Sequence, residues 1–488
     1  MNAAIDMPQV IPQLADYIRI LPEIVLAVFG MIVMLLDPLV DEGRSQKTLG
    51  IIALIGSLAA LAATLFQSQY PGLGFWNMVQ VDSFSIFFHV LVMAVTAVVI
   101  LTSYEYMAMQ RIRAGEYYAL ILMGALGMSL MSSAVELVLI FIALEISSIS
   151  TYILAGFRRR TAISSESSLK YFLLGSFATA FFLYGVALMF GATGSTSITV
   201  IGQALRLERI PVLAYVGVAF MFVGLGFKVG AAPFHVWTPD VYEGAPAPIV
   251  GFMSTAPKAA VFAVLLRIMF EVDAPGRVWL IWVVAALSMT LGNVGALVQD
   301  NVKRLLAYSS IAHAGYLLIA FAALPNNGIP AVMFYLASYA AMNVGAFAVI
   351  SHIGGEGERY VTLQDYEGLG RRSPLLAAIL TIFLLSLIGI PITGGFFAKF
   401  YVFSAALQAN LVGLVIIGVL NSAVASYYYL RLIVVMYMRD AREDVPVSPV
   451  PVGLGAALAI SLGTTIYLGV LPGRVLDYAA RTVSAWAR

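Results

Sequence analysis

Long runs of apolar residues separated by short polar connections dominate this 488-residue sequence. A helix needs about 20 mostly apolar residues to cross the hydrocarbon core of a bilayer. The pattern therefore predicts an all-α polytopic membrane protein with about 14 transmembrane helices. The predicted segments are 20–36, 49–66, 82–102, 117–132, 135–155, 170–190, 212–230, 249–270, 278–298, 303–322, 329–352, 375–403, 411–438 and 449–470.

Two of these segments contain residues that interrupt helices. The seventh ends in G-L-G-F-K-V-G-A-A-P, where Gly230 and Pro233 follow Lys228. The twelfth contains G-I-P-I-T-G-G-F-F-A-K-F, which runs from Gly389 to Phe400. Glycine and proline destabilise a helix, and proline also removes a backbone donor. We therefore expect helices 7 and 12 to be broken, each with a lysine beside the break.

A short internal similarity divides the chain. A-L-G-M-S-L from Ala125, with S-S-I at Ser147, resembles A-L-S-M-T-L from Ala286, with S-S-I at Ser309. The copies begin five segments apart, and an odd number of crossings inverts the second copy. We predict two inverted five-helix repeats, helices 4–8 and 9–13. The predicted domains are an N-terminal three-helix segment (1–110), the first repeat (111–272), the second repeat (273–440) and helix 14 with a tail (441–488).

The basic residues outside the segments predict the orientation in the membrane. Lysine and arginine are more numerous in connections that follow odd-numbered segments, and such connections tend to be cytoplasmic. An even number of helices then places both termini on the non-cytoplasmic side. The first residues, Met1 to Tyr17, lack the basic region of a cleavable signal peptide, so we expect the first helix to be retained.

The composition agrees with a membrane protein and excludes some chemistry. Hydrophobic residues make up 61% of the chain and charged residues 11%, with a mean hydropathy of +0.93. Because there is no cysteine, the chain holds neither a thiolate-bound iron–sulfur cluster nor a disulfide. A net charge of +1 gives no support for nucleic-acid binding. The loop G-G-E-G-E-R at Gly354 completes no phosphate-binding motif, and we expect no metal or cofactor in this chain.

Five ionisable residues fall well inside the predicted spans: Glu145, Lys228, Lys258, His313 and Lys399. At 1.5 Å per residue, three of them lie ~14–15 Å into their segments, near the middle of a ~30 Å core. A charge at that depth costs about 2.5–3.5 kcal/mol, so several at one level indicate an ion path.

Each of these residues also has a structural interpretation. Lys228 could snorkel to the interface from a helix end. Glu145 either pairs with Lys228 or forms a hydrogen bond to a neighbouring helix. Lys258 could have no role beyond balancing the negative charge of Glu145. If Glu145 pairs with Lys228, moving the carboxylate changes whether the lysine keeps its proton.

The two histidines on or near this path also leave alternatives open. His235, just past the break, is either an interfacial side chain or a proton carrier. His313 is a proton relay, a satisfied core histidine or a haem ligand, although four scattered histidines make no paired haem pattern. Two further charges, Glu23 beside Pro22 and Arg431 near a helix end, are expected at the membrane interface.

Together these motifs resemble the antiporter-like subunits of respiratory complex I, over roughly residues 80 to 440. The resemblance rests on G-F-K-V-G-A-A-P-F-H-V-W from Gly226, the acidic helix at Glu145, the P-K pair at Lys258, K-R-L-L-A-Y-S-S-I-A-H-A-G-Y from Lys303 and G-F-F-A-K-F from Gly395. Within that family, W-T-P-D-V-Y-E-G-A-P from Trp237 resembles the subunit N branch.

The resemblance implies a proton-translocating subunit of a bacterial NADH:quinone oxidoreductase in the cell inner membrane. Glu145 and Lys228 would be a coupled ion pair, Lys258 a central relay and Lys399 the terminal lysine, with His235 and His313 assisting. NADH, FMN, iron–sulfur clusters and quinone would bind partner subunits, among them a further antiporter-like subunit. The alternatives are an Mrp-type cation/proton antiporter subunit and a non-conducting membrane-arm scaffold.

Overall fold

The structure is a computed structural model that describes residues 12–40, 42–207, 212–272, 276–324, 328–442, 445–446 and 448–486. One small antiparallel hairpin, β1 (Gly72–Gly74) and β2 (Val79–Val81), accompanies an otherwise helical chain in those ranges. The helices of the first half are α1 (Leu14–Arg19), α2 (Leu21–Leu36), η1 (Asp37–Leu39), α3 (Glu42–Gln67), α4 (Ser83–Gln110), α5 (Gly115–Ser133), α6 (Leu137–Ala155), α7 (Ala162–Thr193), α8 (Ile198–Leu207), α9 (Val212–Val229), α10 (Thr238–Gly244), α11 (Ala247–Met253) and α12 (Ala256–Glu271).

The second half is also helical. Its elements are α13 (Arg277–Leu297), α14 (Val302–Ala322), α15 (Gly328–Ile353), η2 (Glu356–Glu358), η3 (Leu363–Tyr366), α16 (Leu369–Arg372), α17 (Pro374–Ile388), α18 (Gly394–Gln408), α19 (Val412–Met438), α20 (Val452–Val470) and α21 (Gly473–Trp486). Among the described residues, twelve helical stretches are long and apolar enough to cross a membrane. These twelve coincide with predicted segments. The other two predicted segments correspond to α5 and to the α17–α18 pair, so the count of fourteen remains a prediction.

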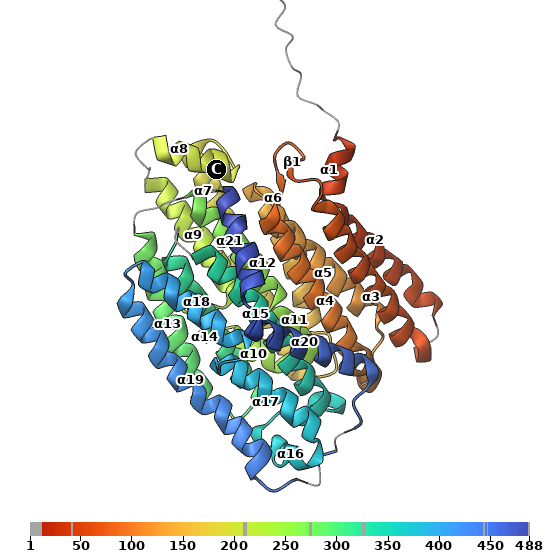
Figure 1. The fold of residues 1–488 in the computed structure, drawn as a ribbon. Coiled ribbons are helices and arrows are strands. Elements are labelled where there is room, and N and C mark those ends of the chain that lie inside the picture. The colour runs from red at the N-terminus through yellow and green to blue at the C-terminus, as the bar shows by residue number, and fades with distance from the viewer. Residues whose placement is uncertain are drawn as a thin grey trace, which may run out of the picture.

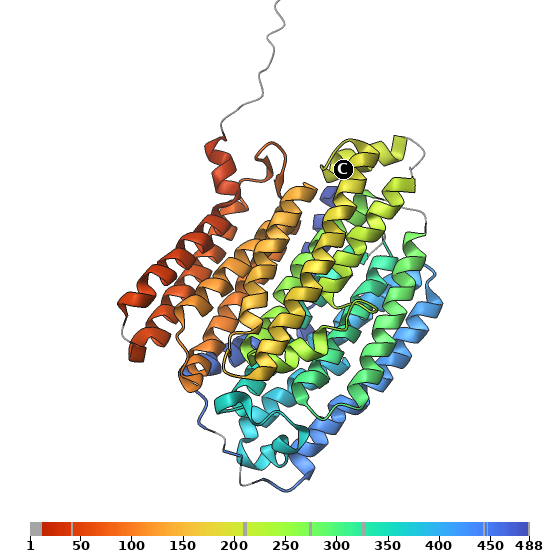
Figure 2. The same cartoon turned by 180° about the vertical axis from the view of Figure 1, so that it is seen from behind.

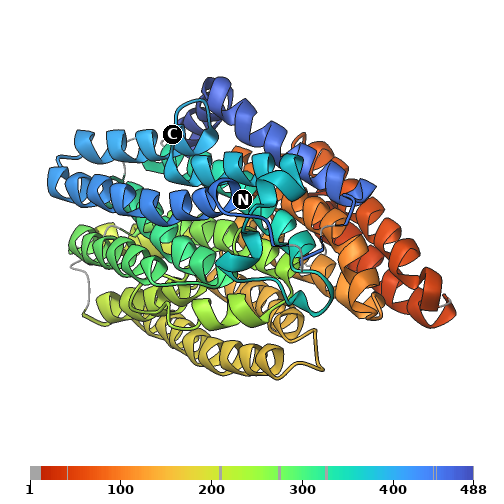
Figure 3. The ribbon, with the colours of Figure 1, turned by 90° about the horizontal axis from the view of Figure 1, so that it is seen from below.

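The helices form an elongated bundle (Figures 1 and 2). Seen from below, α2 and α3 lie at one end, and α13 and α19 lie at the other (Figure 3). The continuous stretch made of α11 and α12 is fully buried inside the bundle, and α14 and α15 are nearly fully buried. The charged side chains of interest are therefore carried largely by helices that are covered by other helices.

Both predicted breaks are confirmed. Helix α9 ends at Val229, and Gly230 follows with a φ of 71°, a left-handed conformation that suits glycine. Helix α17 ends at Ile388, and Gly389 follows with a φ of 95°. The predicted segment 249–270 is present as the apolar stretch Ala247–Glu271, in which a turn at Ser254 and Thr255 separates α11 from α12. The sequence S-T-A-P explains this turn, since Pro257 suits the first turn of a new helix.

The two halves share a backbone feature that supports the predicted inverted repeats. Glu136 caps α6 and pairs with Ser197, and Asn301 caps α14 and pairs with Thr362, both as isolated antiparallel bridges. In each bridge, the two paired residues are the same number of positions apart along the chain. Helix α8, which follows the first bridge, lies at the opposite end of the molecule from α16, which follows the second (Figure 1).

Candidate functional site

Lys228 lies in the last turn of α9, where the helix dipole favours a positive charge. Its side chain is buried, and Nζ lies 4.6 Å from the ring centroid of Tyr152 on α6 and 5.1 Å from that of Tyr171 on α7. Aromatic faces attract cations, most strongly where water is excluded. This enclosure between two rings disfavours the snorkelling interpretation.

Glu145 lies on α6, the helix that also carries Tyr152. Its carboxylate attracts the Lys228 ammonium electrostatically. However, the two groups form no direct ion pair within 4.0 Å in the part of the chain that the structure describes. The Oε1 atom of Glu145 is buried without a hydrogen-bond partner among the described residues. The predicted pair is thus close in space but not in contact.

The break after Lys228 is an ordered segment. The Ala232 amide donates to Ser288 Oγ on α13 at 2.8 Å. The Trp237 indole nitrogen donates to the carbonyl of Phe227 at 2.9 Å, which folds the segment back onto α9. Satisfied backbone groups allow irregular structure at membrane depth. His235 lies half-buried within this segment.

Lys258 is the third residue of α12 and has an exposed fraction of only 1%. Its Nζ donates to the Ser310 carbonyl oxygen at 2.8 Å and to Ser310 Oγ at 2.5 Å. The Tyr339 hydroxyl donates to the same Oγ at 2.9 Å. A Cβ atom at Gly230 would lie 3.9 Å from Lys258 Nζ. The ammonium group therefore lies between the break of helix 7 and the middle of α14.

His313 lies one turn beyond Ser310 on α14 and is also buried. Its Nδ1 is 2.7 Å from the Tyr335 hydroxyl, and its Nε2 is 3.4 Å from the Tyr429 hydroxyl. Both ring nitrogens thus face tyrosine hydroxyls, which disfavours a haem-ligand role. The His313 ring lies 5.0 Å from the ring of Tyr339, which shares Ser310 with Lys258. It lies 5.7 Å from the ring of Tyr316, over which Lys399 lies.

Lys399 lies on α18, just past the second break. Its Nζ donates to the carbonyl of Ile388, the last residue of α17, at 2.8 Å, and lies 4.8 Å from the Tyr316 ring centroid. The last carbonyls of a helix lack intrahelical partners, so a cation stabilises that end. Lys399 therefore has the same kind of setting as Lys228, at a helix C-terminus and over an aromatic ring.

The structure brings most of the predicted site residues into one buried region that extends from α6 to α18. The sequence did not identify the aromatic and hydroxyl side chains around these charges. Ser310 lay inside the motif quoted from Lys303 and inside the repeated S-S-I at Ser309, but neither pattern indicated that it contacts a charge. The side chains that were missed are Tyr152, Tyr171, Ser310, Tyr316, Tyr335, Tyr339 and Tyr429.

A second group of buried charges surrounds Glu358, in the loop G-G-E-G-E-R. Its carboxylate accepts hydrogen bonds from Lys303 Nζ at 2.6 Å, the Tyr106 hydroxyl at 2.8 Å and the Ala247 amide at 2.7 Å. Arg158 adds an ion pair at 3.4 Å. Burial alone would raise the pKa of Glu358, but Lys303 and Arg158 hold that pKa below its usual value. We call these residues the Glu358 cluster.

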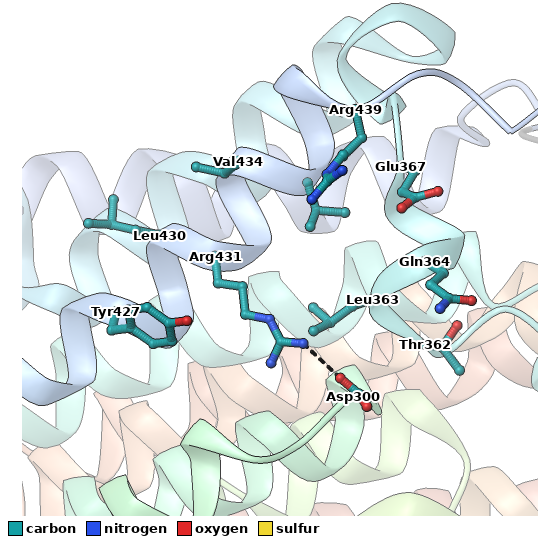
Figure 4. A pocket seen from close by; sticks show the side chains of 11 residues that line it. Asp300, Thr362, Leu363, Gln364, Glu367, Tyr427, Leu430, Arg431, Val434 and Arg439 are labelled. Atoms are coloured by element: carbon teal, nitrogen blue, oxygen red, sulfur yellow. Dashed lines mark hydrogen bonds and ion pairs between the residues drawn. The ribbon is translucent and has the colours of Figure 1, made fainter.

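A pocket of about 710 Å³ is lined by no residue of either group. Its lining residues come from α19, η3 and the loop before α14, and Arg431 pairs there with Asp300 at 2.8 Å (Figure 4). None of the buried lysines lines it. No cluster of three or more His, Asp or Glu side chains within the described ranges is arranged to hold a metal ion.

Known proteins resemble the chain over nearly its whole length. The family described as "NADH:quinone oxidoreductase/Mrp antiporter, TM" matches residues 134–425. NADH-quinone oxidoreductase subunit N 2 of Koribacter versatilis is 67% identical over 97% of this chain and 98% of its own. A chain of respiratory complex I from Thermus thermophilus is 38% identical, covers 93% of this chain and 98% of its own, and has a TM-score of 0.81. A chain of the Mrp complex from Dietzia sp. shares the fold, with 20% identity over 96% of this chain and 97% of its own and a TM-score of 0.81.

The chain belongs to the NADH:quinone oxidoreductase/Mrp antiporter family of membrane proteins. Within that family it falls among the N subunits, which are antiporter-like subunits in the membrane arm of complex I. The chain is accordingly a subunit of a multi-subunit translocase, and the resemblance inferred from the motifs is confirmed.

Proposed function

We propose that this subunit conducts protons through a chain of buried residues that runs from Glu145 and Lys228 through Lys258 and His313 to Lys399. His235 would assist transfer near the first break. The observation that carries this proposal is the setting of Lys258. Its ammonium is buried, has only Ser310 as a hydrogen-bond partner among the described residues, and borders an unwound segment.

The proposed driving step is electrostatic. Glu145 attracts Lys228 without contacting it, so a small displacement of α6 changes the field at the ammonium. Removing the carboxylate takes away an interaction that favours the charged form of the lysine. The proton then moves toward Lys258, whose hydroxyl partners Ser310 and Tyr339 can both donate and accept. Redox chemistry in other subunits would drive the displacement.

The test is NADH-driven proton pumping by the assembled complex in proteoliposomes after Lys228→Ala. We expect pumping per NADH oxidised to fall, with the subunit still present in the complex. Lys47→Ala, at an exposed position on α3, is the control and should pump normally. Undiminished pumping by Lys228→Ala would overturn the role of Lys228. Normal pumping after substitution of each buried lysine would support the non-conducting scaffold instead.

The wider setting belongs to the same proposal. NADH, FMN, iron–sulfur clusters and quinone would bind partner subunits, and a further antiporter-like subunit would adjoin this one in the membrane arm. The bacterial cell inner membrane would contain the complex, with both termini on the non-cytoplasmic side. The four-part division at residues 110, 272 and 440 would separate the N-terminal segment, the two inverted repeats and helix 14. The two matching bridges support that division.

A further inference from the structure

A third set of buried polar side chains lies in the N-terminal helices, away from the proposed path. It contains Glu23 on α2, Gln67 at the end of α3, His89 on α4 and Ser129 on α5. Glu23 is 5% exposed, and the other three are fully buried. The sequence had suggested the membrane interface for Glu23 and no role for His89. Four helices therefore meet at one histidine and one carboxylate.

The hydrogen-bond partners of His89 favour its doubly protonated form. Nδ1 is 3.1 Å from Gln67 Oε1, and Nε2 is 3.0 Å from the Ser129 carbonyl oxygen. The Gln67 amide orientation is fixed because its Nε2 donates to the Arg19 carbonyl. Both ring nitrogens thus face oxygen atoms that can only accept. A neutral imidazole has one N–H, whereas the imidazolium has two.

Glu23 supplies the charge that such an imidazolium requires. Its Oε1 lies 3.6 Å from His89 Nε2 and accepts a 2.6 Å hydrogen bond from the Ser129 hydroxyl. A buried charge is tolerated when an opposite charge and hydrogen bonds accompany it. The next charges that act on His89 are Asp82 and Arg267, which have opposite signs and pair with each other at 3.1 Å. Glu23 is therefore the dominant neighbouring charge.

We infer that His89 is a proton-binding site, in which the bound proton is held as an imidazolium paired with Glu23. The loaded site ties α3 and α5 to α4 through its two N–H groups, and Glu23 joins α2 through Ser129. Loss of the proton leaves one ring nitrogen facing an acceptor without a hydrogen between them. The proton thus fastens the N-terminal three-helix segment to α5, the first helix of the predicted first repeat.

The direct test is ¹⁵N solid-state NMR of the whole complex with ¹⁵N-labelled histidine. Subtracting the spectrum of His89→Gln from that of the unchanged complex isolates His89. At pH 7 we expect two protonated ring nitrogens. Subtracting His352→Gln instead isolates a half-buried histidine at the end of α15, outside this set of side chains, and serves as the control for the subtraction. One protonated and one unprotonated nitrogen at His89 would overturn the inference.

A second variant keeps the inference testable if His89→Gln fails to assemble. Glu23→Gln removes the counter-charge but keeps the shape and the acceptor for Ser129. We expect the ratio of imidazolium to neutral His89 at pH 7 to fall at least tenfold, seen in the unchanged-minus-Glu23→Gln spectrum. Amide hydrogen exchange in α2 and α4 should become faster in the same variant. An unchanged histidine spectrum and unchanged exchange would overturn the inference.

Discussion

The Glu358 cluster and the row of buried lysines are both charges hidden from water, but they are bonded very differently. Glu358 receives three hydrogen bonds and a further ion pair, and Lys303 donates in addition to the carbonyls of Glu243 and Ala245. Within the described part of the chain, Lys228 lies over two aromatic rings and forms no hydrogen bond, and Lys399 bonds a single carbonyl. A charged group with a full set of hydrogen bonds is held in its ionised form. A lysine with few partners loses few interactions when it releases its proton.

The difference follows from what each region must do. Removing one member of a buried ion pair leaves an uncompensated charge, so a saturated network resists change. A group that binds and releases protons must be stable in both forms, which excludes such a network. The Glu358 cluster joins α4, α11 and α14 near their ends, through Tyr106, Ala247 and Lys303, whereas the lysines lie where the helices are broken.

The largest expected effect is the loss of Lys303. After Lys303→Met, Glu358 stays buried but loses one of its two cationic partners, which we expect to destabilise the folded subunit by about 3–5 kcal/mol. We expect the subunit to be depleted from the complex, measured by its recovery in purified membranes. Glu358→Gln combined with Lys303→Met should recover part of that loss. Normal recovery of the single variant would show that the two regions do not differ as described.

Lys258→Met should give the opposite result. It removes a charge with few partners, so the complex should assemble, while proton pumping per NADH oxidised should fall severely. The measurement is the ratio of the pH change to NADH oxidation in proteoliposomes. If Lys258→Met prevents assembly as Lys303→Met does, Lys258 is a structural charge and the contrast fails.

Ser310→Ala should have a smaller effect. It removes one of the two acceptors of Lys258 and leaves the Tyr339 hydroxyl without that partner. A hydrogen bond to a charged group contributes about 1.5–3 kcal/mol, so we expect pumping to slow by roughly tenfold or more without loss of the subunit. Ser426→Ala is the matched control, because this half-buried serine bonds only the Ser422 carbonyl of its own helix α19 among the described residues. Pumping rates equal to the control would exclude Ser310 from the path.

The smallest effect concerns acid stability. Because the pKa of Glu358 is held below its usual value of 4.5, its pairing stabilises the subunit at higher pH, and this contribution is lost as pH falls through the lowered pKa. The thermal stability of the unchanged complex and of Glu358→Gln should therefore differ at pH 7 and converge below about pH 4.5. A difference that persists unchanged at low pH would contradict the assigned charge state.

The sequence was informative where local chemistry decides the structure. Gly230 and Gly389 marked both breaks, because few other residues adopt the backbone found there. The apolar runs placed the helices, and the charges within them identified Lys228, Lys258 and Lys399. The turn before Lys258 was missed because S-T-A-P suits both a continuous and a restarted helix. The tyrosines and Ser310 were missed because their contacts join helices far apart in the sequence.

The same limit explains the outcome for Glu23 and His89. Each looks unremarkable within its own helix, and only the packing of α2 against α3, α4 and α5 gives them partners. The sequence indicated no role for Glu358 beyond a loop that completes no phosphate-binding motif, because its cationic partners lie far away in the sequence, Arg158 between α6 and α7 and Lys303 on α14.

The complete burial of the α11–α12 stretch has a consequence for the order of biosynthesis. This stretch emerges from the ribosome before α15, which packs on α11, and before α14, which carries the hydrogen-bond acceptor of Lys258. Until those later helices enter the membrane, Lys258 faces lipid or trapped water at the full cost of an unpaired charge. The newly made chain must therefore hold an open, incompletely packed bundle until the second half of the protein has been synthesised.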